Sequence, residues 1–396
     1  MPSTAPATAT VSLGIDRLLA SERHLLQGRR VGLVCNPASV NGALRHSADA
    51  MFDDPDIRLA AIFGPQHGLR ADLQDNMIET PHGRDPRRSV PVFSLYSEVR
   101  EPSAEMLEGL DAIVVDLQDV GTRVYTFVYT MANCMRAAAR HGIPVIVCDR
   151  PNPVNGVDVE GHVLDDSFAS FVGQYPIPLR HGLTIGELAR LFNVQFGINA
   201  DLEVVPMDGW QRAMFFDETA LPWVMPSPNI PTLDSAIVYP GAVLFEGTQL
   251  SEGRGTTRPF ELIGAPWIDG DRFAEAMNLR DLAGVHFRPV FFEPTFQKHA
   301  KETCGGCQLH VLDRRVFEPV RTAVEMLDEF RLEEPAKFAW RDPPYEYEHE
   351  KMPIDILYGS TRLREAIESG RIVPLLELAK RDEERFRETR EPFLLY

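Results

Sequence analysis

The stretch AIVVDLQDVGTRVY, residues 112–125, decides the fold class of this chain of 396 residues. It opens with a continuous apolar run that ends at Asp116, and polar residues and a glycine follow. A run that is apolar at every position, rather than at alternate positions, is typical of a parallel strand that is covered on both faces. Residues 123–141 then show the apolar spacing of a helix. The stretch therefore predicts one strand–helix unit of a parallel sheet.

Similar units surround this one throughout the first half of the chain. Alternation of short apolar runs with helical patterns predicts an open, mostly parallel α/β sheet. The other expected strands are 30–36, 59–63, 91–95, 144–149 and 202–205, and the other expected helices are 14–27, 43–51, 103–110 and 185–196.

The pattern changes after about residue 240, and we expect a second, smaller α+β domain there. The predicted boundaries are 12–238 for the α/β domain and 239–396 for the smaller one. The segment WVMPSPNIPT, residues 223–232, contains too many prolines for a helix or a central strand and is expected to be a loop near the junction. Glycines and aromatic residues dominate 239–268, strand-like runs follow at 284–292 and 307–311, and helical patterns return at 314–330 and 361–369.

The charge and the cysteines limit the possible partners and compartment. The chain has 40 Lys and Arg against 58 Asp and Glu, a net charge of −18, which disfavours binding to nucleic acid or to anionic lipid. The first twenty residues lack the pattern of a signal peptide, and the five cysteines are sparse and odd in number. We therefore expect free thiols and a cytoplasmic location, without a membrane span.

Polar segments follow three of the expected strands, at 64–70 (GPQHGLR), 116–125 and 149–156 (DRPNPVNG). Ligands of open parallel sheets bind beyond the carboxyl ends of the strands, so these segments are expected to line one cleft. For any single residue in them, a helix cap or a turn is the alternative. A second cluster, 239–256, places Glu246, Glu252 and Arg254 among glycines, for which the alternative is a surface turn.

Several chemistries have no sequence support. The strand–helix turns carry neither GxGxxG nor GxxxxGK[ST], and the chain has neither a GxSxG elbow nor an HExxH pair. Cys304 and Cys307 form a CxxC pair that nothing completes into a zinc site. We therefore expect neither a cofactor nor a metal. Carboxylates, amides and arginines remain, which is the composition of a carbohydrate site in which two carboxyl groups flank a glycosidic bond.

At these motifs the sequence resembles the bacterial exo-acting β-N-acetylmuramidases, which release N-acetylmuramic acid from the non-reducing ends of peptidoglycan fragments. The resemblance extends from residue 31 to residue 355 and is strongest at 116–125, 149–156, 226–232 and 239–256. It implies a Rossmann-like N-terminal domain, a smaller C-terminal domain and an active site in the cleft between them. It also implies a glycoside hydrolase that acts on a small anionic sugar or muropeptide.

One residue departs from the usual pattern of that family. Its members usually carry Pro-Glu-His-Gly after the second strand, whereas this chain has Gln66, and an amide serves neither as a general acid nor as a carboxylate nucleophile. One branch of the family shares this Gln, followed by a stretch such as DNMIE at 75–79. Three hypotheses stay open: an exo-muramidase that uses another carboxylate, a hydrolase of a different small glycoside, and a non-catalytic sensor of sugars or muropeptides.

The resemblance also suggests roles for individual residues. Arg123 or Arg254 is expected to hold the lactyl carboxylate of muramic acid, because an Arg donates two parallel hydrogen bonds. Gln66, Asp116, Asn152 and Arg254 are expected to line one interdomain cleft. The candidate catalytic carboxylates are Asp116, Asp119, Glu246, Glu252 and Glu79. The candidate substrate-binding residues are Gln66, His67, Gln118, Arg123, Tyr125, Asn152, His181, Asn229 and Arg254.

Overall fold

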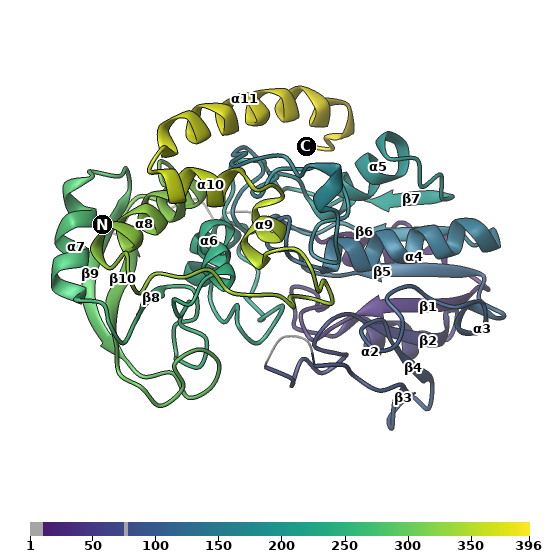
Figure 1. Ribbon diagram of the computed structural model, residues 1–396. Helices are drawn as coiled ribbons and strands as arrows, with labels where there is room; N and C mark the ends of the chain where they lie inside the picture. The colour runs from purple at the N-terminus through teal and green to yellow at the C-terminus, as the bar shows by residue number, and fades with distance from the viewer. Residues whose placement is uncertain (1–10, 75–77) are drawn as a thin grey trace, which may run out of the picture.

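A computed structural model describes residues 11–74 and 78–396 (Figure 1). Its larger sheet has seven strands in the order β3-β4-β2-β1-β5-β6-β7. All neighbouring strands in it are parallel except the short edge pair β3–β4. Without β3, the strands lie in the order third, second, first, fourth, fifth, sixth, which is the Rossmann order. The strands are β1 (Arg30–Cys35), β2 (Arg58–Gly64), β3 (Gly83–Arg84), β4 (Pro91–Ser94), β5 (Ala112–Asp116), β6 (Val145–Cys148) and β7 (Leu202–Val205).

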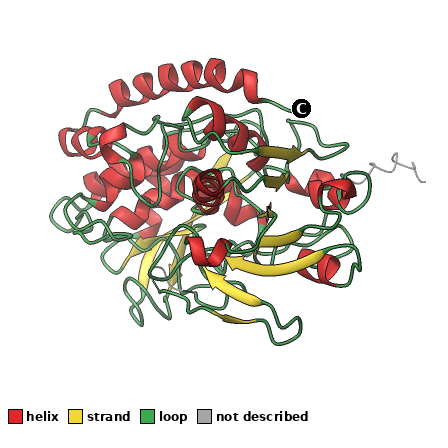
Figure 2. Cartoon of the chain, turned by 90° about the vertical axis from the view of Figure 1, so that its right-hand side faces the viewer, coloured by secondary structure: helices red, strands yellow, loops and turns green. Residues whose placement is uncertain are grey.

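Helices cover both faces of this sheet, and Figure 2 shows the strands between them. Successive strand residues point to opposite faces, so Val114 packs in one core cluster and Val115 in the other. Both clusters are buried, which explains why the strands are apolar at every position. Helices α1 (Gly14–Leu18) and α2 (Ser47–Phe52) cover one face, and α4 (Phe127–His141) and α5 (Ile185–Gln195) cover the other, with α3 (Ala104–Leu107) beside α4.

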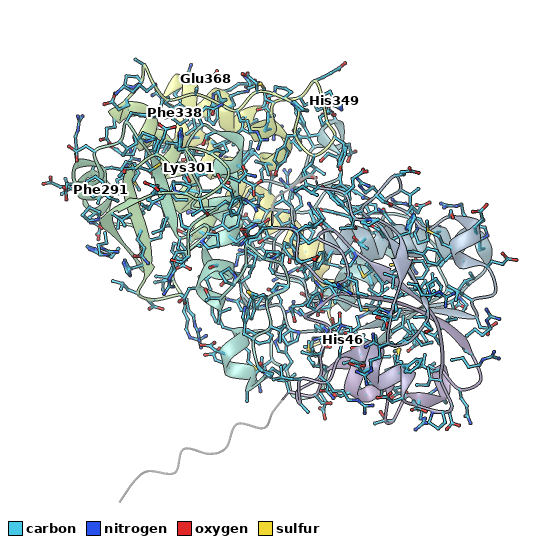
Figure 3. The ribbon with its side chains drawn as sticks, turned by 90° about the horizontal axis from the view of Figure 1, so that it is seen from below. His46, Phe291, Lys301, Phe338, His349 and Glu368 are labelled. Carbon is cyan, nitrogen blue, oxygen red and sulfur yellow. The ribbon has the colours of Figure 1, made fainter. Side chains whose placement is uncertain are left out.

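The second half of the chain forms a smaller antiparallel sheet, in the order β8-β10-β9, with helices packed against it. Figure 3 shows Phe291 of β9 at the outer edge of this sheet, where its side chain is 70% exposed. The elements of this half are α6 (Leu233–Ala242), the 3-10 helix η4 (Val243–Gly247), β8 (Leu262–Ala265), α7 (Gly270–Leu279), β9 (Val285–Phe292), β10 (Cys304–Val311), α8 (Pro319–Glu333), α9 (Pro353–Tyr358), α10 (Arg362–Ser369) and α11 (Ile372–Arg390).

The C-terminal segment connects the two halves. Helix α11 packs against α8 and, as Figure 1 shows, runs across the molecule toward α5. The Arg390 guanidinium at its end donates to the carbonyl oxygen of Gly182 at 2.6 Å, and the Tyr396 hydroxyl donates to Asp149 Oδ2 at 2.6 Å. The last residues of the chain therefore pack on the larger sheet, although most of the second half lies elsewhere.

The fold class agrees with the expectation of a mostly parallel α/β sheet with a smaller part that mixes helices and strands. The segment rich in glycines and aromatic residues, which begins at 239, starts inside helix α6. Thr232 caps this helix by accepting a hydrogen bond from the Ser235 backbone N–H at 3.2 Å. Among the described residues, no helix combines the length and the apolar character that a membrane span requires.

Candidate active site

One cavity is lined by residues from both halves of the chain. The first half contributes Gln66 and His67, which follow β2, together with residues 124–127 at the start of α4. The second half contributes Tyr239 of α6, Glu246 of η4, Arg254, Tyr345 and Glu346. Two carboxylates and one guanidinium therefore meet in one buried space.

Glu246 is held as a carboxylate by two donors. Its Oε1 accepts a hydrogen bond from Arg254 Nη2 at 2.7 Å, and its Oε2 accepts one from the Tyr345 hydroxyl at 2.8 Å. Burial alone would raise the pKa of Glu246, but the Arg254 charge and its hydrogen bond outweigh burial and keep this pKa below its usual value. Glu246 is therefore ionised at neutral pH.

Glu252 and Phe260 hold the Arg254 guanidinium in place, and one of its N–H groups remains available to a ligand. Its Nε lies 3.4 Å from Glu252 Oε1, and Glu252 Oε2 accepts a hydrogen bond from Lys298 Nζ at 2.7 Å. The guanidinium carbon lies 5.1 Å from the centre of the Phe260 ring. Within the described part of the chain, the buried Nη1 atom of Arg254 has no hydrogen-bond partner. A buried guanidinium N–H in this position is suited to bind an oxygen of a ligand.

Glu346 is the second carboxyl group of the cavity, and its surroundings differ from those of Glu246. Its side chain is buried, Oε2 accepts a hydrogen bond from the Tyr96 hydroxyl at 2.9 Å, and Oε1 lies 3.5 Å from Gln66 Nε2. Burial raises the pKa of Glu346 to about 7 and the nearby Glu246 charge adds to this, although the Tyr96 hydrogen bond opposes it. Gln66 Oε1 in turn accepts from the Thr126 hydroxyl at 2.7 Å.

Six of the residues predicted from the sequence line this cavity. Tyr125 packs its ring edge-on against Tyr239, with 6.1 Å between the ring centres. His67 Nδ1 lies 2.8 Å from the carbonyl oxygen of Leu73, and Asn229 Nδ2 donates to the carbonyl oxygen of Gln74 at 2.7 Å. The six residues are Gln66, His67, Tyr125, Asn229, Glu246 and Arg254.

The expectation that Asp116 and Asn152 share this cleft with Gln66 and Arg254 is wrong. Asp116 ends β5 at the sheet's switch point, where its carboxylate accepts from Arg150 Nε at 2.6 Å and from Arg150 Nη2 at 2.9 Å. Asn152 Nδ2 donates to the carbonyl oxygen of Leu183 at 2.9 Å. Asp116 and Asn152 thus bind the protein's own polar groups, and the cavity lies to one side, next to β2 and α4.

Four further candidates lie outside the cavity lining and bind main-chain groups instead. The Arg123 guanidinium donates to the carbonyl oxygens of His162, Ile177 and Leu357 at 2.8–3.0 Å. Asp119 Oδ2 accepts from the Gly121 N–H at 2.7 Å, and Gln118 Nε2 donates to the carbonyl oxygen of Pro151 at 2.8 Å. His181 Nδ1 accepts from the Leu183 N–H at 3.1 Å.

The two remaining carboxylate candidates are close to the cavity without lining it. Glu252 lies behind Arg254, as described above. Glu79 is exposed, with Oε1 at 3.3 Å from Arg100 Nη2 and at 3.5 Å from the Tyr347 hydroxyl oxygen. Residues 75–77 of the DNMIE stretch lie outside the described residues.

Glu346, Tyr345 and Tyr96 were not found from the sequence. The available signal was the segment PPYEYE, residues 343–348, in which two prolines precede alternating tyrosines and glutamates. Nothing local in that segment indicates that it contacts Gln66, from which Glu346 is separated by 280 positions. Within residues 11–74 and 78–396, groups of three or more His, Cys, Asp and Glu arranged to hold a metal ion are absent.

Two buried carboxyl groups with different hydrogen-bond partners, Glu246 and Glu346, line this cavity, and most glycoside hydrolases use a pair of carboxyl groups. The family models of exo-β-N-acetylmuramidase NamZ match this chain, the N-terminal model at residues 31–234 and the C-terminal model at residues 237–396. The chain therefore belongs to the exo-β-N-acetylmuramidase family, and it is a glycosidase.

Similar proteins cover nearly the whole chain. It is 47% identical over 387 residues, 98% of this chain and 91% of the relative, to the peptidoglycan β-N-acetylmuramidase NamZ of Bacillus subtilis (strain 168). A crystal structure of a DUF1343 family protein from Bacteroides fragilis is 32% identical with a TM-score of 0.88, and covers 98% of this chain and 99% of its own. A second such protein from that organism is 28% identical with a TM-score of 0.77 and the same coverage.

Proposed function

We propose that this enzyme hydrolyses the β-glycosidic bond of N-acetylmuramic acid at the non-reducing end of peptidoglycan fragments, in the cavity lined by both halves of the chain. The observation that carries the proposal is the meeting of Glu246, Glu346 and Arg254 in that cavity. The relative from B. subtilis, a peptidoglycan β-N-acetylmuramidase, supports the choice of substrate. A site that held only one sugar unit would account for attack at chain ends.

Arg254 is the residue that we propose to recognise muramic acid. This sugar differs from N-acetylglucosamine by a lactyl ether with a carboxylate. That carboxylate suits the buried Nη1 donor of Arg254, for which the described residues provide no hydrogen-bond partner. The buried groups Glu246, Glu252, Arg254 and Lys298 carry two negative and two positive charges, so their cluster has no net charge to repel the substrate. Arg123, the other candidate, lies outside the cavity lining, and both of its Nη atoms donate to main-chain carbonyl oxygens.

Glu246 is the carboxylate that we propose to face the reacting carbon. As the bond to the leaving oxygen breaks, positive charge develops on C1 and the ring oxygen of the sugar. The Arg254 and Tyr345 hydrogen bonds keep Glu246 ionised and oriented before the reaction begins. A carboxylate fixed in this way stabilises the developing charge without reorganising, which is a major source of rate enhancement.

The test compares an aryl β-N-acetylmuramide with the matching aryl β-N-acetylglucosaminide. We expect turnover of the muramide, with kcat/KM higher by about 10–100-fold, because hydrogen bonds to a charged group contribute roughly 1.5–3 kcal/mol. Arg254→Lys should reduce that preference, whereas Arg258→Lys, on the same segment but half-exposed, should keep it. Equal turnover of both substrates would refute the muramic acid assignment, and binding without turnover would favour the sensor hypothesis.

We also propose that the enzyme meets its substrate in the cytoplasm. All five cysteines are free and buried, and free thiols are the usual state in a reducing compartment. Fractionation of the source cells tests this location. We expect the activity to be recovered with the cytoplasmic contents, and recovery with the medium or the envelope would contradict the proposal.

A further inference from the structure

We infer that Glu346 is the general acid of this enzyme, the group that protonates the glycosidic oxygen of the leaving group, and that Gln66 is its positioning residue. The inference rests on the proposed hydrolysis and adds to it the source of the proton. It begins from a contact between distant segments, the 3.5 Å approach of Gln66 Nε2 to Glu346 Oε1 inside the cavity.

The hydrogen bonds around Gln66 orient its amide toward Glu346. The Thr126 hydroxyl donates to Gln66 Oε1 at 2.7 Å, so the amide nitrogen faces the Glu346 carboxyl group. Tyr96 holds the other carboxyl oxygen by donating to Oε2 at 2.9 Å. Glu346 is thus held on both oxygens by side chains from the first half of the chain, although its own backbone belongs to the second half.

The backbone that presents Glu346 is a strained turn. Tyr345 and Glu348 exchange two main-chain hydrogen bonds of 2.9 Å, and the residues between them, Glu346 and Tyr347, have φ angles of 44° and 68°. A two-residue turn with two positive φ values favours Asn-Gly, because other side chains are strained there. A glutamate and a tyrosine in this turn indicate a functional requirement for their side chains.

Cation–π contacts of Arg100 with Tyr96 and Tyr347 support the turn. The Arg100 guanidinium carbon lies 4.3 Å from the centre of the Tyr96 ring and 4.5 Å from that of Tyr347. Tyr96 therefore donates a hydrogen bond to Glu346 and also packs on Arg100, which contacts Tyr347. These contacts fix the position of Glu346 while its carboxyl group stays in the cavity.

The electrostatic surroundings suit a proton donor. The ionisable groups that line the cavity with Glu346 are His67 after β2, Tyr125 before α4, Tyr239 of α6, Glu246 of η4, Arg254 and Tyr345, and Tyr96 contacts it from the segment after β4. Burial raises the pKa of Glu346 to about 7, so it is protonated in weakly acidic solution, when Glu246 is already ionised. Two carboxyl groups separated in pKa by their surroundings divide the acid role from the charge-stabilising role.

The reaction step balances in protons and electrons. Glu346 gives its proton to the glycosidic oxygen while the C1–O bond breaks, and the bonding electron pair leaves with that oxygen as the alcohol of the departing sugar. Water supplies the hydroxyl group that replaces it at C1. The second proton of that water passes to a carboxylate, so the enzyme ends with as many protons as it had at the start.

The test uses Glu346→Gln with two aryl β-N-acetylmuramides, one with a dinitrophenyl leaving group and one with an unactivated phenyl leaving group. Dinitrophenolate leaves without protonation, whereas phenol needs a proton. We expect kcat/KM for the phenyl substrate to fall about 10²–10⁴-fold, the usual loss for a general acid, and kcat/KM for the dinitrophenyl substrate to fall less than about 10-fold. Glu348→Gln, which changes a carboxylate of the same turn outside the cavity lining, should leave both substrates unaffected.

The pH profile gives a second readout. With the phenyl substrate, wild-type activity should fall as the pH rises above about 7, because Glu346 then loses its proton. With the dinitrophenyl substrate, Glu346→Gln should lack that fall. An equal loss on both substrates, in a variant whose circular dichroism matches the wild type, would refute the role of Glu346 while leaving the hydrolase intact. Failure of the wild type on both muramides would instead refute the proposed function.

Discussion

Buried carboxylates in this enzyme differ according to the cation beside them. Both carboxylate oxygens of Asp116 accept hydrogen bonds from Arg150, and Asp116 also accepts one from the Ser47 hydroxyl. Its hydrogen-bonding capacity is therefore used within the protein. Glu246 shares Arg254 with Glu252 and stays next to an open cavity. Glu346 is held by hydrogen bonds from Tyr96 and Gln66. The groups that surround each carboxylate, rather than burial alone, separate the structural Asp116 from the carboxylates that line the cavity.

Asp116→Asn should therefore affect stability and leave catalysis intact. Removing one partner of a buried ion pair leaves Arg150 uncompensated and costs about 3–5 kcal/mol of unfolding free energy. Asp56→Asn, at an exposed pair with Arg23, should cost less than about 1 kcal/mol. Urea unfolding measures both values. A folded Asp116→Asn protein with kcat lowered more than about 100-fold would contradict this assignment, because losses of that size mark a catalytic group.

At the scale of single residues, sequence analysis found those that lie in long motifs. Gln66, Glu246 and Arg254 follow recognisable strand ends or glycine-rich segments, and the structure brings them together. It could not find Glu346, since the turn at 345–348 reaches Gln66 only through tertiary packing. Asp116 was grouped with the site because the carboxyl ends of parallel strands lie at one edge of a sheet. That rule does not reveal that Arg150 occupies the hydrogen-bonding positions of Asp116.

At the scale of elements, the packing of α6 on α8 sets the position of Glu246. Helix α6 carries Tyr239 and continues directly into η4, which carries Glu246. Gly241 lets the two helices approach closely, because a Cβ atom there would lie 1.9 Å from the carbonyl oxygen of Pro319. The sequence analysis missed most of α6 because Pro240 and Gly241, both unfavourable in helices, lie in its last turn. By contrast, strand 112–116 was predicted with both ends correct, since its apolar run is bounded by polar residues.

Gly241→Ala should push α6 away from α8 and displace Glu246. We expect a loss of about 1–3 kcal/mol in unfolding free energy, the usual cost of overpacking, together with lower kcat. Gly83→Ala is the matched control, since its added Cβ meets nothing within 4 Å, and it should change stability by less than about 0.5 kcal/mol. Thermal and urea unfolding with parallel activity assays compare the two. Equal stability of the two variants would show that α6 and α8 do not require this approach.

At the scale of the whole molecule, several buried carboxyl groups make stability depend on pH. Burial is the main cause that raises the pKa values of Asp149, Glu160, Glu346 and Glu383 to about 7. A carboxyl group whose pKa is higher in the folded state stabilises the fold while it is protonated, and this contribution is lost as the pH rises through the folded-state pKa. The net charge of −18 acts in the same direction, because self-repulsion grows as further carboxyl groups ionise.

The enzyme should therefore be less stable at pH 8 than at pH 6. A carboxyl group that is protonated in the folded state and ionised in the unfolded state lowers the unfolding free energy by up to about 1.4 kcal/mol for each unit that the pH rises. Glu383→Gln should flatten the pH dependence without touching the cavity, because Glu383 Oε1 accepts from the Gly161 N–H on the α11 side of the molecule. Urea unfolding at several pH values measures the slope. A constant or rising unfolding free energy from pH 6 to pH 8 would be inconsistent with these raised pKa values.

The most direct test of the active-site assignment is a crystal structure of the Glu346→Gln variant with an uncleaved disaccharide of N-acetylmuramic acid β-linked to N-acetylglucosamine. We expect the muramic acid unit in the cavity, with its lactyl carboxylate on Arg254 and its C1 facing Glu246. The glycosidic oxygen should lie roughly 2.6–3.2 Å from the side chain at position 346. A sugar bound instead over Asp116 and Arg150, or with its glycosidic oxygen far from position 346, would contradict it.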